Sequence, residues 1–140
     1  MNYNELTYHH FESAANAGVL VGPDTRRGAA GNRALGTWVQ FDVQFGAGRA
    51  QSLQGAPVEE AVRAAEQTVQ AVRFLAYGCP HVIAVADWIA GQATSRQSGT
   101  ELPESVQSLR ERFDVPVEKL GRLLIIEDAW RAAVSSPDMG

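Results

Sequence analysis

The sequence predicts a single α+β domain over residues 1–140, with a small antiparallel three-stranded sheet and helices packed on one face. Residues 38–45 alternate apolar and polar side chains, which is typical of a strand with one buried face. Residues 58–72 instead place apolar side chains at helical spacing. A chain of 140 residues is long enough to bury a real core in one domain.

The first half of the chain predicts one helix, one loop and two strands. A short helix covers residues 3–16. Its adjacent histidines, His9 and His10, point about 100° apart, and such neighbours rarely share one metal ion, so a packing or surface role is expected for both. Residues 22–36 are rich in glycine and arginine without the spacing of a phosphate-binding loop, which predicts a solvated loop. The strand at 38–45 follows, and residues 49–53 form a short second strand.

The second half predicts a third strand among helices. An inserted helix covers about residues 57–72, because Pro57 suits its first turn and the apolar stripe follows. The third strand covers residues 72–77, and a helix over residues 82–90 ends at Gly91. Another helix opens at Pro103, and the last one begins near Leu120 and frays at Ser135.

Composition excludes several classes of function. The net charge is −4 and no basic cluster occurs, which argues against a nucleic-acid-binding surface. No leader pattern and no apolar run near 18 residues occurs, so neither secretion nor a membrane span is expected. The single cysteine cannot form an internal disulfide, which favours a reducing compartment and a cytoplasmic location.

That cysteine, Cys79, lies in a stretch that links an apolar strand to a helix. Gly78 permits a tight turn, and Pro80 suits a first helical turn, so Cys79 is expected at the helix N-cap. There the unpaired N–H groups and the helix dipole favour a thiolate. A buried cysteine that acts as a small apolar side chain is the alternative. His81 follows closely, but no acid or oxyanion partner for a Cys-His hydrolase is identifiable.

Four short motifs follow one another along the chain. They are His10-Phe11-Glu12 with Asn16 and Gly18, Ala34-x-Gly36 ahead of the strand, Arg73-Phe74-x-x-Tyr77-Gly78-Cys79, and Ile126-Glu127-Asp128-Ala129. Together they resemble the iron–sulfur cluster assembly scaffolds, the IscU proteins and the N-terminal domain of NifU. The resemblance spans nearly the whole chain and implies an antiparallel three-stranded sheet with helices packed against it. The inserted helix lengthens this chain relative to the family.

The resemblance also implies a cluster site built from three cysteines, an aspartate and a histidine. Only the middle cysteine is present here, as Cys79. Leu35 and Arg122 occupy the other two cysteine positions, Thr37 the aspartate position and Gly121 the histidine position. A two-iron cluster usually takes four thiolate or imidazole ligands, so one chain cannot complete the family site. Iron or a cluster bound through Cys79 would need a second chain or a thiol cofactor.

Three functions follow from this reading, none of them enzymatic. The first is a divergent scaffold-like protein of iron–sulfur cluster assembly, with iron or an iron–sulfur cluster as its implied cofactor. The second is a single-cysteine sulfur carrier that takes persulfide sulfur from a cysteine desulfurase. The third is a non-catalytic interaction protein on the same fold. The expected partners are a desulfurase or other iron–sulfur assembly proteins, and whether the chain forms a homodimer stays open.

The resemblance places Arg122 beside Cys79. A guanidinium next to a thiol lowers its pKa, and the helix N-terminus acts in the same direction. Burial opposes both effects, and Leu35 is expected to add to that burial. We expect the charges to prevail, which leaves Cys79 reactive at neutral pH.

Overall fold

The protein folds as a three-stranded antiparallel sheet with helices on one face, which confirms the predicted α+β class. The computed structural model describes residues 3–45, 69–94 and 102–135. The sheet order is β1-β2-β3. The elements in chain order are α1 (Glu5–Ser13), β1 (Thr25–Asn32), η1 (Arg33–Leu35), β2 (Thr37–Phe45), β3 (Val69–Tyr77), α3 (Pro80–Ala93), α4 (Val106–Arg112), η3 (Val117–Lys119) and α5 (Leu120–Ser135).

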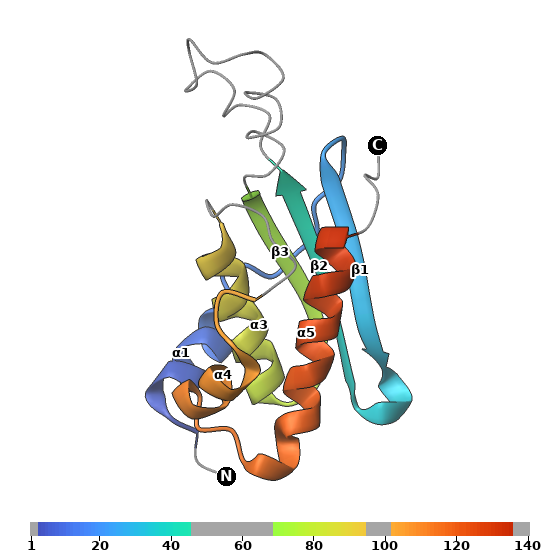
Figure 1. Ribbon diagram of the computed structural model, residues 1–140. Helices are drawn as coiled ribbons and strands as arrows, with labels where there is room; N and C mark the ends of the chain where they lie inside the picture. The colour runs from blue at the N-terminus through green and yellow to red at the C-terminus, as the bar shows by residue number, and fades with distance from the viewer. Residues whose placement is uncertain (1–2, 46–68, 95–101, 136–140) are drawn as a thin grey trace.

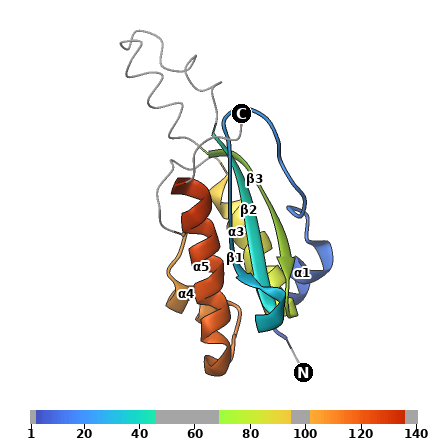
Figure 2. The ribbon, with the colours of Figure 1, turned by 90° about the vertical axis from the view of Figure 1, so that its right-hand side faces the viewer.

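Two helices cover the inner face of the sheet. Helix α5 packs along β1 and β2, and α3 packs on β3 (Figure 1). Helix α1 packs against α3 rather than on the sheet, and Figure 2 shows α5 on one side of the strands. We call the face turned away from α3 and α5 the outer face. None of the helices in the described ranges combines the length and the hydropathy that a membrane-spanning helix requires.

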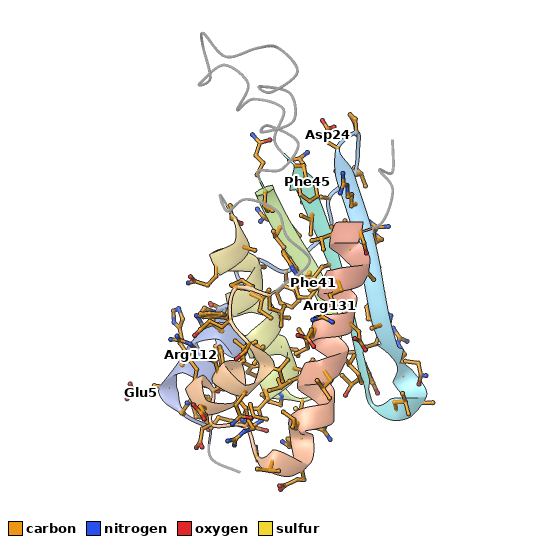
Figure 3. All side chains as sticks on the ribbon, viewed as in Figure 1. Glu5, Asp24, Phe41, Phe45, Arg112 and Arg131 are labelled. Atoms are coloured by element: carbon orange, nitrogen blue, oxygen red, sulfur yellow. The ribbon has the colours of Figure 1, made fainter. Side chains whose placement is uncertain are left out.

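The core is built on the alternation predicted for residues 38–45. Val39, Phe41 and Val43 are fully buried, whereas Gln40 and Gln44 between them are partly exposed. Phe41 points from β2 toward α5, where its ring meets the edge of Trp130 at 5.4 Å between centroids (Figure 3). The predicted phase of this strand is therefore confirmed.

Asp42 is the exception on the outer face, because it is fully buried there. Arg27 donates two hydrogen bonds to the Asp42 carboxylate, from Nε at 2.7 Å and from Nη2 at 2.9 Å. The backbone N–H of Leu20 donates a third at 2.9 Å. A buried charge is tolerable only when paired and hydrogen-bonded in this way. The pair also holds the segment before β1 across the outer face.

The first strand was predicted as a loop, and that prediction is wrong. Residues 25–32 form β1, although they read Thr-Arg-Arg-Gly-Ala-Ala-Gly-Asn without any apolar alternation. Pairing with β2 and contact with α5 make this segment a strand, so tertiary packing overrides weak local propensity. Gly28 is required here, because a Cβ at this position would lie 2.0 Å from the backbone nitrogen of Ala133 in α5.

The third strand starts earlier than predicted. Residues 69–72 belong to β3, not to the predicted helix at about 57–72. Val72 pairs with Val43 and Val69 with Phe45, so a bulge adds Gln70 between them. The bulge turns both valines inward although they are three residues apart, which is helical spacing. The rest of the predicted helix and the predicted strand at 49–53 lie outside the described residues.

The remaining helices agree with prediction apart from their ends. Helix α3 continues through Gly91 to Ala93, and α4 begins at Val106 rather than at Pro103. Ser105 caps α4 by accepting a hydrogen bond from the N–H of Ser108 at 3.1 Å.

The buried carboxylate of Asp87 on α3 ties the N-terminal segment to the fold. It contacts His10 Nδ1 at 2.6 Å and accepts a hydrogen bond from the N–H of Asn16 at 2.9 Å. Beyond this anchor the chain pairs with the outer edge of β3, where Gly18 N–H donates to the Phe74 carbonyl at 2.8 Å. His10 thus serves to dock α1.

The burial pattern of β2 predicts unequal losses along the strand. Phe41→Ala should lower the free energy of unfolding by about 3–5 kcal/mol, because it removes a buried ring beside Trp130. Gln44→Ala, the matched outer-face control, should change it by about 0.5 kcal/mol or less. Urea unfolding measures both, and equal losses would contradict the strand phase.

Candidate functional site

Cys79 lies at the N-cap of α3, as predicted. Its backbone is extended, with φ −77° and ψ 168°, and Pro80 occupies the first turn of the helix. Gly78 before it has φ +159°, at the limit of the range that side chains rarely adopt, so the turn from β3 into α3 depends on a glycine. The thiol is partly buried and forms no disulfide.

Cys79 lines an open pocket of about 420 Å³. Its lining residues come from segments at the lower end of the molecule in Figure 1, where β3 ends and α3 and α5 begin. Gly36 comes from the link between β1 and β2, Tyr77 and Gly78 from the end of β3, and Arg122 from the first turn of α5. The volume falls within the range of pockets that hold small ligands.

The structure brings together two of the five residues at the family positions. Cys79 and Arg122 both line the pocket. Leu35 does not line it and is 68% exposed, so the expectation that Leu35 buries Cys79 is wrong. Leu35 ends the 3₁₀ turn η1, and the next residue, Gly36, lines the pocket instead. Thr37 is buried and Gly121 is exposed, and neither lines the pocket.

The electrostatics of the pocket favour a thiolate. Burial raises the pKa of the Cys79 thiol, but four contacts outweigh it and leave the pKa below its ordinary value. These are, in decreasing order, the N–H of Val82, the Arg122 side chain, the N–H of His81 and the positive charge of Lys119. The thiol accepts no cap hydrogen bond of ordinary geometry, so we attribute the effect of the helix N-terminus to its oriented amides.

Lys119 was not identified from the sequence as a residue that acts on this thiol, and His81 was considered there only as the partner of a Cys-His hydrolase. His81 is 3% exposed, and its Nδ1 lies 3.5 Å from the Lys119 ammonium. The Tyr3 ring packs edge-on against it, 4.7 Å between centroids. Burial, Lys119 and Arg122 lower the pKa of His81 to about 4, although Asp114 opposes them. The sequence signal that could have placed Lys119 near Cys79 is its spacing from Arg122, because residues three apart lie on the same side of a helix.

The residues in the pocket do not fit a resident iron–sulfur cluster within one chain. The lining supplies a single thiolate, and the guanidinium beside it would repel a metal cation. Within residues 3–45, 69–94 and 102–135, no group of three or more His, Cys, Asp or Glu side chains could hold a metal ion. The arrangement instead suits a nucleophilic sulfur in an electropositive, solvent-accessible pocket.

Comparison with known proteins supports the fold. No protein-family model matches the sequence, and no curated protein matches it. Among solved structures, the chain is similar to the crystal structure of a candidate iron–sulfur cluster assembly scaffold protein for the SUF system, FiSufU, from the thermophile Fervidobacterium islandicum AW-1. The TM-score is 0.60 at 11% identity, over 95% of this chain and 96% of that one. At this identity the likeness shows the fold alone.

The contact between Arg122 and the sulfur predicts how the thiol titrates. In the wild type, Cys79 should titrate below the ordinary thiol range, and Arg122→Ala should raise its pKa and slow alkylation near pH 7 several-fold. Arg131→Ala is the matched control, because Arg131 lies on α5 but pairs with Glu127. Thiolate absorbance and alkylation rate followed against pH measure the effect. A wild-type thiol with an ordinary pKa would contradict it.

The lowered pKa of His81 predicts a pH dependence of stability. The folded state keeps His81 neutral down to about pH 4, whereas the unfolded chain takes up a proton below about 6.5. The unfolded state therefore binds more protons between these values, and the free energy of unfolding should fall as the pH drops from 6.5 to 4. His81→Gln should flatten this slope, and the exposed His9→Gln should not. Urea unfolding at several pH values tests the difference.

Proposed function

We propose that this chain serves iron–sulfur cluster assembly as a divergent, scaffold-like protein whose Cys79 accepts sulfane sulfur. The observation that supports this most is the pairing of one thiol with Arg122 in an open pocket at a helix N-terminus. The similarity to a candidate SUF-system scaffold supports the setting. In this proposal the protein carries sulfur stoichiometrically and is not an enzyme.

The transfer needs no external oxidant. The Cys79 thiolate attacks the outer sulfur of a donor persulfide, R–S–SH. A new sulfur–sulfur bond forms on Cys79, the bond between the two donor sulfurs breaks, and the donor leaves as a thiolate. The proton stays on the transferred sulfur. Arg122 and the amides of α3 would stabilise the attacking thiolate and then the anionic form of the product persulfide.

A cysteine desulfurase is the donor that this chemistry implies, because it presents sulfur as a protein persulfide. A reducing compartment such as the cytoplasm would keep Cys79 available as a thiol. Iron or a cluster is the less favoured cargo, because its remaining ligands would have to come from a second chain or a thiol cofactor.

Persulfide formation on Cys79 tests the proposal. The protein is incubated with either a cysteine desulfurase and cysteine, or inorganic polysulfide as a partner-independent donor. Mass spectrometry should find one extra sulfur atom on the Cys79 peptide, removable by reductant. Cys79→Ser should abolish it and Arg122→Ala should reduce it several-fold, because the thiolate fraction falls. Arg131→Ala should leave it unchanged.

Two results would overturn the proposal. One is no added sulfur on Cys79 from either donor. The other is a stable cluster in the monomeric protein after anaerobic reconstitution with iron and sulfide, visible by its charge-transfer absorption and lost in Cys79→Ser. The second result would favour a cluster-binding scaffold instead.

A further inference from the structure

The outer face of the sheet carries an apolar patch close to the thiol. Trp38 lies directly opposite Tyr77 in the pairing of β2 with β3, and Leu75 shares their face. Tyr77 is 47% exposed and Leu75 37%, and Trp38 is half-buried. Leu35, at the end of η1, is also exposed. We call Leu35, Trp38, Leu75 and Tyr77 the aromatic patch.

The aromatic patch is continuous with the thiol pocket. Tyr77 belongs to both, because its side chain stands on the outer face and the residue lines the pocket. Leu35 directly precedes Gly36, which also lines the pocket. A molecule that covers the patch would therefore also reach Cys79.

The charge around the aromatic patch is positive although the chain carries −4 overall. The Arg33 guanidinium lies over the Tyr77 ring, 5.5 Å from its centroid. Arg122 and Lys119 act on the sulfur itself. Among the strand residues on the outer face, the one acid is Asp42, which is buried and bound by Arg27. Charge complementarity thus favours an acidic occupant.

We propose that the aromatic patch is the docking surface for a partner-protein segment that combines apolar side chains with carboxylates and brings its sulfur to Cys79. Exposed apolar side chains rimmed by charge mark protein interaction sites, and aromatic and arginine side chains dominate binding energy at such sites. The docking surface itself does not depend on the proposed function. Only the statement that the segment delivers sulfur to Cys79 rests on that function.

Disulfide exchange with two synthetic peptides tests the docking surface. Each peptide carries one cysteine as a mixed disulfide with thiopyridine, flanked either by leucine and aspartate or by serine and lysine. The Cys79 thiolate attacks the peptide sulfur and forms a new disulfide with the peptide. Thiopyridine leaves with the electron pair of the broken bond and takes up a proton, and its light absorption gives the reaction rate. The leucine–aspartate peptide should react about tenfold faster at low salt, equivalent to about 1.4 kcal/mol. Salt should reduce this preference.

Variants separate docking from thiol reactivity. Leu35→Ser and Leu75→Ser should reduce the preference for the leucine–aspartate peptide, because each removes an exposed apolar contact without touching the core. Val21→Ser is the matched control, because Val21 is 73% exposed and lies outside the aromatic patch. Dipyridyl disulfide, which is small and uncharged, should react equally with all four proteins.

Equal rates for the two peptides, or a preference that survives both Leu35→Ser and Leu75→Ser, would overturn the proposal. So would a homodimer that Leu35→Ser dissociates, because a second copy would then occupy the patch. Peptide preference without persulfide transfer would keep the docking surface and remove the sulfur-acceptor function. Persulfide transfer without peptide preference would do the reverse.

Discussion

The direct contact between β1 and α5 at Gly28 is the constraint on which the rest of this structure depends. No side chain separates the strand from the helix there, since a Cβ would come within 2.0 Å of the Ala133 backbone nitrogen. The contact lets Trp130 reach Phe41 and lets Arg26 donate to the Val134 carbonyl at 3.1 Å. It thereby fixes the height of α5 along the sheet. Because a helix is rigid, this fixes Arg122, three turns away, at the end of β3.

The site itself is an electrostatic arrangement more than a set of ligands. One sulfur sits at the start of α3, and both nearby side-chain charges that act on it are positive. Burial is the largest single effect on the pKa of Cys79 and works against the thiolate, but the helix amides and the two cations together outweigh it. The pocket is open, so a partner can approach the sulfur. His81 remains neutral beneath Lys119 and adds no further charge near neutral pH. The outcome is a thiol that ionises more readily than a free cysteine and lies in a pocket open to solvent.

Features that depend on neighbouring residues could be predicted from the sequence, whereas features that depend on long-range packing could not. The phase of β2 and the N-cap position of Cys79 follow from adjacent residues, and both are confirmed. β1 was not predicted because its small residues form a strand only through long-range pairing with β2. The start of β3 was predicted as helix because the bulge at Gln70 places two buried valines at helical spacing. The prediction that Arg122 lies near Cys79 rested on the family resemblance alone. Lys119 and Tyr3 join His81 through packing that no local pattern encodes.

The two edges of the sheet differ, and this difference governs where the sheet can grow. The Asn16–Gly18 backbone already pairs with Phe74 and closes part of the β3 edge. At the other edge, Phe45 N–H donates to the Asp24 carbonyl. Because alternate residues of an antiparallel strand bond to the same neighbour, the backbone N–H and C=O groups of Thr25, Arg27 and Ala29 point away from β2. Within the part of the chain that the structure describes, β1 has no second neighbour and no proline. An incoming strand, from aggregation or from assembly, would therefore add beside β1, at the edge farthest from the thiol.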